Sequence, residues 1–196
     1  MMLAHSQGSL LNAAKLAAGL GISSPTITSY LGLLVGLLLL RRLPPYLPNV
    51  RKRLVKSPKT YVCDSGLLHT LLGIHSVDEL LGHPVAGMSW EGFVLENLLA
   101  AASEHVRAAF YRTAAGAEID LVLELDGCAG IWAVEVKKNL APKLERGFHS
   151  ALEDLQPDHA FVVYTRSDRY LKSQNVTILS LRELAQELAR LDTGTV

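Results

Sequence analysis

The clearest pattern of apolar and polar positions runs from Glu118 to Lys137, where the two kinds of residue alternate. Alternation at every second position is typical of a strand with one buried face. Two such runs are separated by the loop Asp126–Ala129, so the stretch predicts a β-hairpin. The apolar positions, which would share the buried face, are Ile119, Leu121, Leu123, Leu125, Trp132, Val134 and Val136.

The length of this loop predicts which residues of the two strands lie opposite each other. If Leu125 pairs with Gly130, counting backwards places Glu135 opposite Asp120. Because side chains two apart in a strand point the same way, Asp120, Glu135 and Lys137 would share the second face. Carboxylates about 4.5–5.5 Å apart repel unless positive charge lies between them, and a divalent cation together with the lysine would supply that charge. The alternative is a solvated face whose charges only keep the hairpin soluble.

Helical spacing of apolar residues predicts two short helices near the N-terminus, over residues 9–20 and 25–35. Ser24–Pro25 fits a tight turn that begins the second helix. Two helices joined in this way are typical of a helix-turn-helix, whose second helix enters the major groove of DNA. We therefore expect Thr26 and Thr28, near the start of that helix, to contact nucleic acid.

A hairpin with a basic tip would complete a winged helix. The apolar run Leu37–Leu43 predicts a buried strand, and Thr60–Val62 supplies a partner for it. Between them, prolines disfavour regular structure, and Arg51, Lys52 and Arg53 form a basic tip that suits phosphate groups. The alternative is a packed helix pair with a solvated basic loop.

The remainder of the chain predicts an α/β layer built on a mixed sheet. The expected order is helix, three strands, helix, two strands and a last helix, which Ser180 and Glu183 would begin with a capping box. Gly82–Pro84 breaks the chain, and the domain boundary is placed between Leu72 and Pro84. The expected architecture is a winged helix in residues 1–75 followed by an α/β domain in residues 84–196.

The composition, with 49% hydrophobic and 19% charged residues in 196, indicates a soluble globular chain of one or two small domains. Cys63 and Cys128 are far apart, the histidines form no ligand cluster, and no signal peptide is recognisable. These features predict a reducing cytoplasm and argue against zinc. The apolar run Leu31–Leu40 is shorter than the roughly 20 residues that span a bilayer, so no membrane partner is expected.

Net charge is zero, but its distribution along the sequence is uneven. Residues 1–63 contain eight basic residues and no acidic ones, whereas residues 64–196 contain eleven basic and all nineteen acidic residues. Such asymmetry suggests two modules with different partners. The basic module suits a polyanion such as DNA.

Several short motifs together resemble a known family. They are Tyr30-Leu31, Leu43-Pro44-Pro45-Tyr46, Pro58-Lys59-Thr60-Tyr61-Val62 with Asp64, Gly66 and Leu67, Trp90-Glu91-Gly92-Phe93-Val94, Tyr111-Arg112, Gly116 with Glu118-Ile119-Asp120, and Glu135-Val136-Lys137. They are similar to the C-terminal region of a prokaryotic AAA-type ATPase family. In that family a P-loop ATPase is followed by a winged helix and a domain of unknown function with a PD-(D/E)XK core, the core of restriction endonucleases.

The resemblance implies a Mg²⁺-dependent nuclease site, in which Mn²⁺ could substitute. Asp120, Glu135 and Glu91 would bind the metal, and Lys137 would orient the attacking water or stabilise charge at the scissile phosphate. It also implies DNA as a partner and an ATPase domain in cis or in trans. The implied enzyme class is a metal-dependent phosphodiesterase.

Two departures from the family pattern limit this prediction. The sequence contains no Gly-x-x-x-x-Gly-Lys-Ser/Thr, so it has no ATPase site of that kind, and Ile119 rather than proline precedes Asp120. Two alternatives stay open. The chain could be a non-catalytic nucleic-acid or partner-binding regulatory domain of the ATPase, or an oligomerisation domain that uses the apolar surface of Leu31–Leu40.

Overall fold

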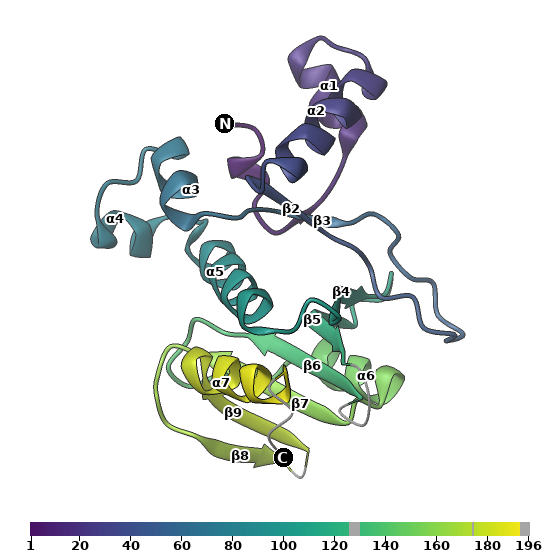
Figure 1. The fold of residues 1–196 in the computed structure, drawn as a ribbon, viewed down its shortest axis with the longest axis vertical. Helices are drawn as coiled ribbons and strands as arrows, with labels where there is room; N and C mark the ends of the chain where they lie inside the picture. Colours follow the sequence, from purple (N-terminus) through teal and green to yellow (C-terminus); the bar gives the residue numbers. More distant parts are fainter. Residues whose placement is uncertain (126–129, 174, 193–196) are drawn as a thin grey trace. The chain divides into compact units, whose positions relative to one another are not determined.

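The computed structural model describes residues 1–125, 130–173 and 175–192, so the predicted loop Asp126–Ala129 lies outside the described residues. The chain divides into two compact units (Figure 1). Unit 1 comprises Met1–Pro44 and Ser57–Phe93, and unit 2 comprises Pro45–Lys56 and Val94–Val196. Both units are therefore built from two separate pieces of sequence. The domain limits 1–75 and 84–196 stay a prediction.

Unit 1 is a small three-stranded antiparallel sheet, in the order β1-β3-β2, with helices around it. Its elements are the 3-10 helix η1 (Ala4–Ser6), β1 (Ser9–Leu10), α1 (Ala13–Leu20), α2 (Ser24–Gly36), β2 (Leu40–Leu43), β3 (Lys59–Val62), α3 (Ser65–Leu71), α4 (Val77–Gly82) and the first half of α5 (Ala86–Ala101). Helices α1 and α2 meet at 106°. The hydroxyl of Ser23 accepts a hydrogen bond from the Thr26 backbone at 3.2 Å, which caps α2.

The predicted buried strand Leu37–Leu43 is only partly correct. β2 begins at Leu40, which packs with Leu16, Ile27 and Leu31, whereas the chain before it turns on the surface. Leu38 is 80% exposed and has a left-handed backbone with φ 57°. The apolar composition of this stretch predicted burial, but the end of α2 leaves its leucines outside the core.

Unit 2 is a six-stranded mixed sheet in the order β4-β5-β6-β7-β9-β8. Strands β4 to β6 are antiparallel, β6, β7 and β9 are parallel, and β8 runs antiparallel to β9. Its elements are β4 (Arg107–Arg112), β5 (Glu118–Glu124), β6 (Ile131–Val136), α6 (Arg146–Leu155), β7 (His159–Tyr164), β8 (Tyr170–Ser173), β9 (Val176–Ser180) and α7 (Leu181–Asp192). The predicted capping box is confirmed, because Ser180 and Glu183 each accept a hydrogen bond from the other's backbone N–H.

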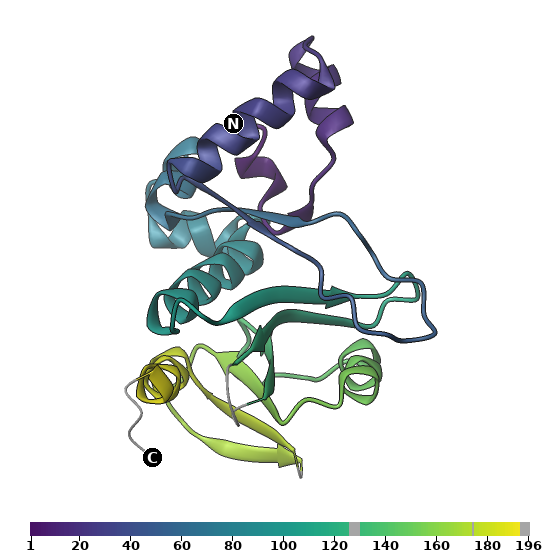
Figure 2. The same ribbon diagram turned by 45° about the vertical axis from the view of Figure 1, so that its right-hand side comes forward.

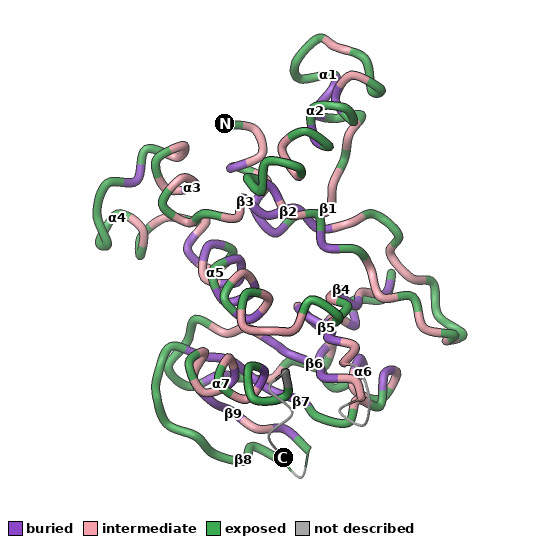
Figure 3. The backbone as a smooth tube through the Cα atoms, viewed as in Figure 1, coloured by how far each residue is buried: buried purple, intermediate pink, exposed green. Residues whose placement is uncertain are grey.

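The register of the hairpin formed by β5 and β6 is confirmed. Glu124 pairs with Ile131, and the Leu125 N–H donates to the Gly130 carbonyl at 2.9 Å, as the count from the loop predicts. The alternative of a solvated second face is wrong. Val122 and Ala133, which share a face with Glu135 in the alternation, are fully buried, and burial continues along β5, β6 and β7 (Figure 3).

The segment Pro45–Lys56, here called the arm, belongs to unit 2 rather than to a wing of unit 1. It runs beside β4 and the turn that follows it (Figure 2). The Val55 N–H donates to the Arg112 carbonyl at 2.9 Å, and the Ala114 N–H donates to the Arg53 carbonyl at 2.8 Å. These bonds cover the outer edge of β4, which the sheet otherwise leaves without a neighbouring strand.

The position of the arm changes the charge balance inferred from the sequence. Unit 1 contains four basic and four acidic residues, and unit 2 contains the remaining fifteen of each. Both units are therefore neutral, because the four cations of the arm join the acidic second half of the chain. The predicted pairing of a basic module with an acidic one does not describe the folded units.

Within the described residues, no single helix is long and apolar enough to cross a membrane. Helices α1 and α2 reach that length and apolarity only when the bent pair is counted together.

Replacing Gly147 with alanine should lower the free energy of unfolding by about 1–3 kcal/mol. A Cβ atom at Gly147, in the first turn of α6, would lie 2.5 Å from the Gly116 carbonyl oxygen, which is backbone and cannot rotate away. Gly87, in the first turn of α5, has open space around its Cβ position and serves as the matched control. Urea unfolding followed by circular dichroism should show G147A destabilised and G87A unchanged or slightly stabilised.

Candidate functional site

Asp120 lies at an irregularity of β5. Between the pairs Ala109–Val122 and Tyr111–Ile119, β5 has one residue more than β4, which is a β-bulge. Bulges bend a strand and redirect side chains, and they are common beside functional sites. The pairs of β5 with β6 end at Leu121 and Val134, one step before Asp120 and Glu135. The charges of both carboxylates act on Lys137, so the two predicted side chains lie in one cluster.

Both carboxylates are held by contacts within unit 2. Asp120 Oδ2 accepts a hydrogen bond from the Val136 backbone N–H at 3.0 Å. Glu135 is 7% exposed, and its Oε1 lies 2.7 Å from the Lys137 ammonium. A buried carboxylate requires a compensating charge, so this ion pair explains how Glu135 is tolerated between the apolar side chains of the sheet.

The pKa of Lys137 is affected by more than one carboxylate. Burial lowers the pKa of Lys137, but the charge and hydrogen bond of Glu135 and the charges of Asp120 and Glu145 outweigh burial, so its pKa is raised. Lys137 is therefore an ammonium at neutral pH, which can stabilise negative charge but cannot remove a proton. Glu145 was not foreseen, since no spacing in the sequence links it to Lys137. It lies just before α6.

Glu91, the third predicted metal ligand, has a different set of partners in unit 1. Its Oε1 accepts a hydrogen bond from the Tyr61 hydroxyl at 2.5 Å and lies 3.1 Å from the Lys59 ammonium. All three residues are buried, with Glu91 5% and Lys59 3% exposed. This ion pair joins α5 to β3 within the core of unit 1. Sequence reasoning missed Lys59 and Tyr61, although both lie within the motifs that carry the family resemblance.

No group of three or more His, Cys, Asp or Glu side chains is arranged to hold a metal ion in the part of the chain that the structure describes. The predicted ligands are divided between the two units, with Glu91 in unit 1 and Asp120 and Glu135 in unit 2, and their joint binding of a metal stays a prediction. Asp120 and Glu135 alone still fit magnesium, which proteins bind through one or two carboxylates and which keeps several waters. These ligands do not fit a structural zinc site, which takes four protein ligands that usually include cysteine or histidine.

The residues predicted to contact nucleic acid are divided between the two units. Thr26 and Thr28 lie on α2 in unit 1, where their hydroxyls bond Ser23 Oγ at 2.8 Å and the Ser24 carbonyl at 2.9 Å. Arg51, Lys52 and Arg53 lie in the arm of unit 2. The predicted recognition helix and its predicted basic tip thus belong to different units.

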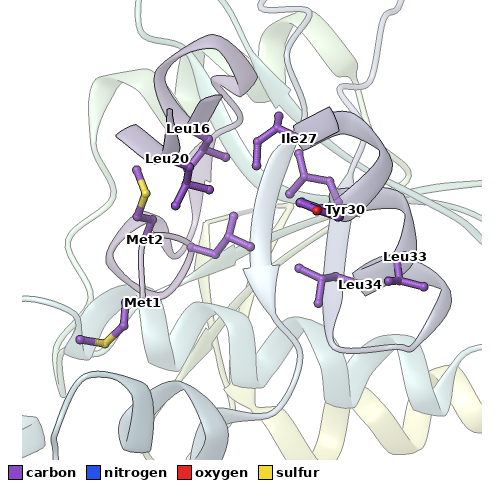
Figure 4. Close-up of a pocket in the computed structure, with 10 residues that line it drawn as sticks. Met1, Met2, Leu16, Leu20, Ile27, Tyr30, Leu33 and Leu34 are labelled. Atoms are coloured by element: carbon purple, nitrogen blue, oxygen red, sulfur yellow. The ribbon is translucent and has the colours of Figure 1, made fainter. Parts of the chain in front are cut away.

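An apolar hollow of about 450 Å³ opens in unit 1 between the N-terminal residues, α1 and α2 (Figure 4). Its lining is Met1, Met2, Leu3, Leu16, Leu20, Ile27, Tyr30, Leu31, Leu33 and Leu34. Leu20, Tyr30 and Leu33 are more than half exposed. The surface that the oligomerisation alternative requires is thus present, and whether it binds a second chain stays a prediction.

Comparison with known proteins places this chain in a family. The family model described as a domain of unknown function, DUF4143, matches residues 86–184. The chain belongs to the DUF4143 family. A second model, also a domain of unknown function and named DUF8612, matches residues 1–78 of this DUF4143 protein.

Two mycobacterial relatives of this DUF4143 protein carry the name uncharacterized protein. One is from Mycobacterium tuberculosis and one from Mycobacterium bovis, and each is 38% identical over 195 residues. The match covers 100% of this chain and 42% of each relative, so the chain spans less than half the length of these curated relatives. No solved structure matches the chain.

Proposed function

We propose that unit 2 of this DUF4143 protein is a PD-(D/E)XK-like, Mg²⁺-dependent phosphodiesterase unit that acts on DNA. The observation that carries the proposal is the cluster of Asp120, Glu135 and Lys137 at the bulged end of a buried hairpin. Two carboxylates and an ammonium in a sheet buried on both faces cost folding free energy, because the charged groups lose their hydration. The order of α5, three antiparallel strands, α6 and the parallel β7 supports the same assignment.

Each member of the cluster has a distinct chemical role in this proposal. Asp120 and Glu135 would hold the metal, and Mg²⁺ when bound would supply Lewis-acid stabilisation of the phosphate and an activated water. The backbone N–H of Val136 orients the Asp120 carboxylate. Lys137, as an ammonium, would donate to a non-bridging phosphate oxygen and stabilise the charge that develops there.

Glu91 has a positioning role in this version of the mechanism. Its carboxylate is occupied by Lys59 and Tyr61, so it would fix α5 rather than bind the metal. This assignment differs from the ligand set implied by the sequence resemblance.

The test is metal-dependent cleavage by the purified chain. A labelled DNA duplex and a supercoiled plasmid are incubated with Mg²⁺, with Mn²⁺ or with EDTA, and products are resolved on gels. The proposal expects cleavage with either cation and none with EDTA. In parallel, electron paramagnetic resonance of added Mn²⁺ should show one bound ion that is lost in D120N. Failure of the wild-type chain to bind Mn²⁺ would overturn the metal assignment.

A second candidate is a non-catalytic, nucleic-acid or partner-binding regulatory domain. The observation that favours it is that Glu91 is committed to Lys59, which leaves two carboxylates at the cluster. This candidate expects DNA binding with no cleavage under any divalent cation. The cleavage assay therefore separates the two candidates.

The wider setting of the chain is also a proposal. Because the mycobacterial relatives are more than twice as long as the matched region, we infer an ATPase domain that acts with this module in cis or in trans. The bent pair of α1 and α2 and the three-stranded sheet of unit 1 support a winged helix, with Thr26 and Thr28 facing DNA. The cytoplasm remains the expected compartment.

A further inference from the structure

The arm encloses a hollow of about 850 Å³ in unit 2. Its lining consists of Leu47, Lys52, Arg53, Leu54, Val55, Lys56 and Ala114. Among these described residues three are cations and none is a carboxylate. A concave surface with charge of one sign concentrates ions of the opposite sign, so the hollow favours anions.

Lys52 is set apart from its neighbours by its contacts. Its ammonium lies 2.7 and 2.9 Å from the two carboxylate oxygens of Asp154 on α6, and it also donates to Ser150 at 3.3 Å. The Tyr111 hydroxyl donates to the same Asp154 at 2.8 Å. Lys52 therefore fastens the arm to α6 and β4, and its charge is neutralised there.

The other cations of the arm are exposed and uncompensated. No ion pair joins Arg51, Arg53 or Lys56 to any residue in the described ranges 1–125, 130–173 and 175–192. Three like charges within six residues repel one another, and the fold gains nothing from keeping them together. A ligand that carries several negative charges would remove this repulsion.

The arm is held to the rest of unit 2 by packing and backbone hydrogen bonds. Leu54 packs against the hydrophobic core beneath α6, and the backbone on either side of it bonds β4 and the turn after it. The turn after β4 lies against the start of α6, because its Gly116 carbonyl is close to Gly147. Glu145, the residue before α6, is a charge partner of Lys137. Contacts thus connect the arm with the start of α6, where the charge of Glu145 acts on Lys137 of the carboxylate cluster.

We propose that Arg53 and Lys56, with Arg51 beside them, bind the phosphate backbone of DNA and present it to unit 2. The inference deepens the proposed function and rests on it for the choice of DNA as the polyanion. The cations of the basic tip then have two different roles. Lys52 binds Asp154 and holds the arm against α6, whereas Arg51 and Arg53 contact the DNA.

The test is equilibrium binding of a fluorescein-labelled 20-base-pair duplex, measured by anisotropy in EDTA at several salt concentrations. EDTA prevents metal-dependent cleavage, so binding is measured by itself. The double variant Arg53→Gln/Lys56→Gln should bind roughly ten-fold more weakly, and the slope of log K against log salt should decrease by about 2, since each phosphate contact contributes about 0.9. The matched control Arg166→Gln/Lys172→Gln removes two exposed cations elsewhere in unit 2 and should bind as wild type does.

Each result of this experiment tests DNA binding by the arm independently of cleavage. Thermal unfolding of both double variants checks that they fold. Equal affinity and slope for wild type and the arm variant would overturn the inference, as would a wild-type chain that fails to bind the duplex at low salt. Loss of binding in the arm variant, in a chain that cleaves nothing with Mg²⁺ or Mn²⁺, would retain the arm as a DNA-binding element and reject the phosphodiesterase.

Discussion

Lys59→Met should lower the free energy of unfolding by about 3–5 kcal/mol, because it leaves the buried Glu91 carboxylate without its ammonium partner. The shape of the methionine side chain is close to that of the lysine stem, so the change removes charge with little loss of packing. Urea unfolding followed by circular dichroism measures the effect. The ion pair is local to unit 1, and its loss should loosen the contact between β3 and α5.

Two further variants separate the charge from the packing. Replacing the whole buried group with apolar residues, as in Lys59→Met/Tyr61→Phe/Glu91→Leu, should recover most of the lost stability, since no charge or hydroxyl is then left behind. Lys172→Met, on the exposed β8, should change the stability by less than about 0.5 kcal/mol. A K59M chain within 1 kcal/mol of wild type, roughly the worth of an exposed pair, would show that the ion pair is not buried in solution.

Glu135→Gln should reduce the rate of Mg²⁺-dependent DNA cleavage by at least about 100-fold, a loss of roughly 3 kcal/mol in transition-state stabilisation. Glutamine preserves the size of the side chain but removes the negative charge that would hold the cation. It also removes the closest charge partner of Lys137. Initial rates on the labelled duplex, compared in Mg²⁺ and Mn²⁺, give the measurement.

Controls for this variant lie in the same unit. Glu153→Gln removes an exposed carboxylate from α6 and should cleave at the wild-type rate. Lys137→Gln should lose cleavage while keeping Mn²⁺ binding, because the proposed mechanism assigns the lysine to the phosphate rather than to the metal. Cleavage at the wild-type rate in both E135Q and K137Q would rule out this cluster as the reacting centre.

The parts of the fold that the sequence predicted well are those set by nearby residues. The register of β5 and β6 follows from alternation and loop length, and the pairs from Glu124–Ile131 to Leu121–Val134 agree with that count. The capping box of Ser180 and Glu183 involves residues three apart. Both depend on interactions within one hairpin or one helical turn, which sequence spacing describes directly.

The parts that the sequence could not predict depend on contacts between distant segments. The partner of Glu91 is 32 residues away, and that of Lys52 is 102 residues away. The edge strand β8 was not predicted because its residues are all exposed and show no apolar alternation. The position of the arm could not be predicted for the same reason, since proline-rich composition indicates an irregular segment but not which unit it joins.

The interleaving of the two units has a consequence for any attempt to divide the chain. The backbone passes between units three times, so a cut at the family boundary near residue 84 does not release a complete unit. A fragment of residues 84–196 would retain eleven basic and sixteen acidic residues, and it would lack the segment that bonds the outer edge of β4. An uncovered strand edge recruits other strands. Such a fragment would therefore tend to aggregate through β4, so a binding or cleavage assay on it would not test the proposals made for the whole chain.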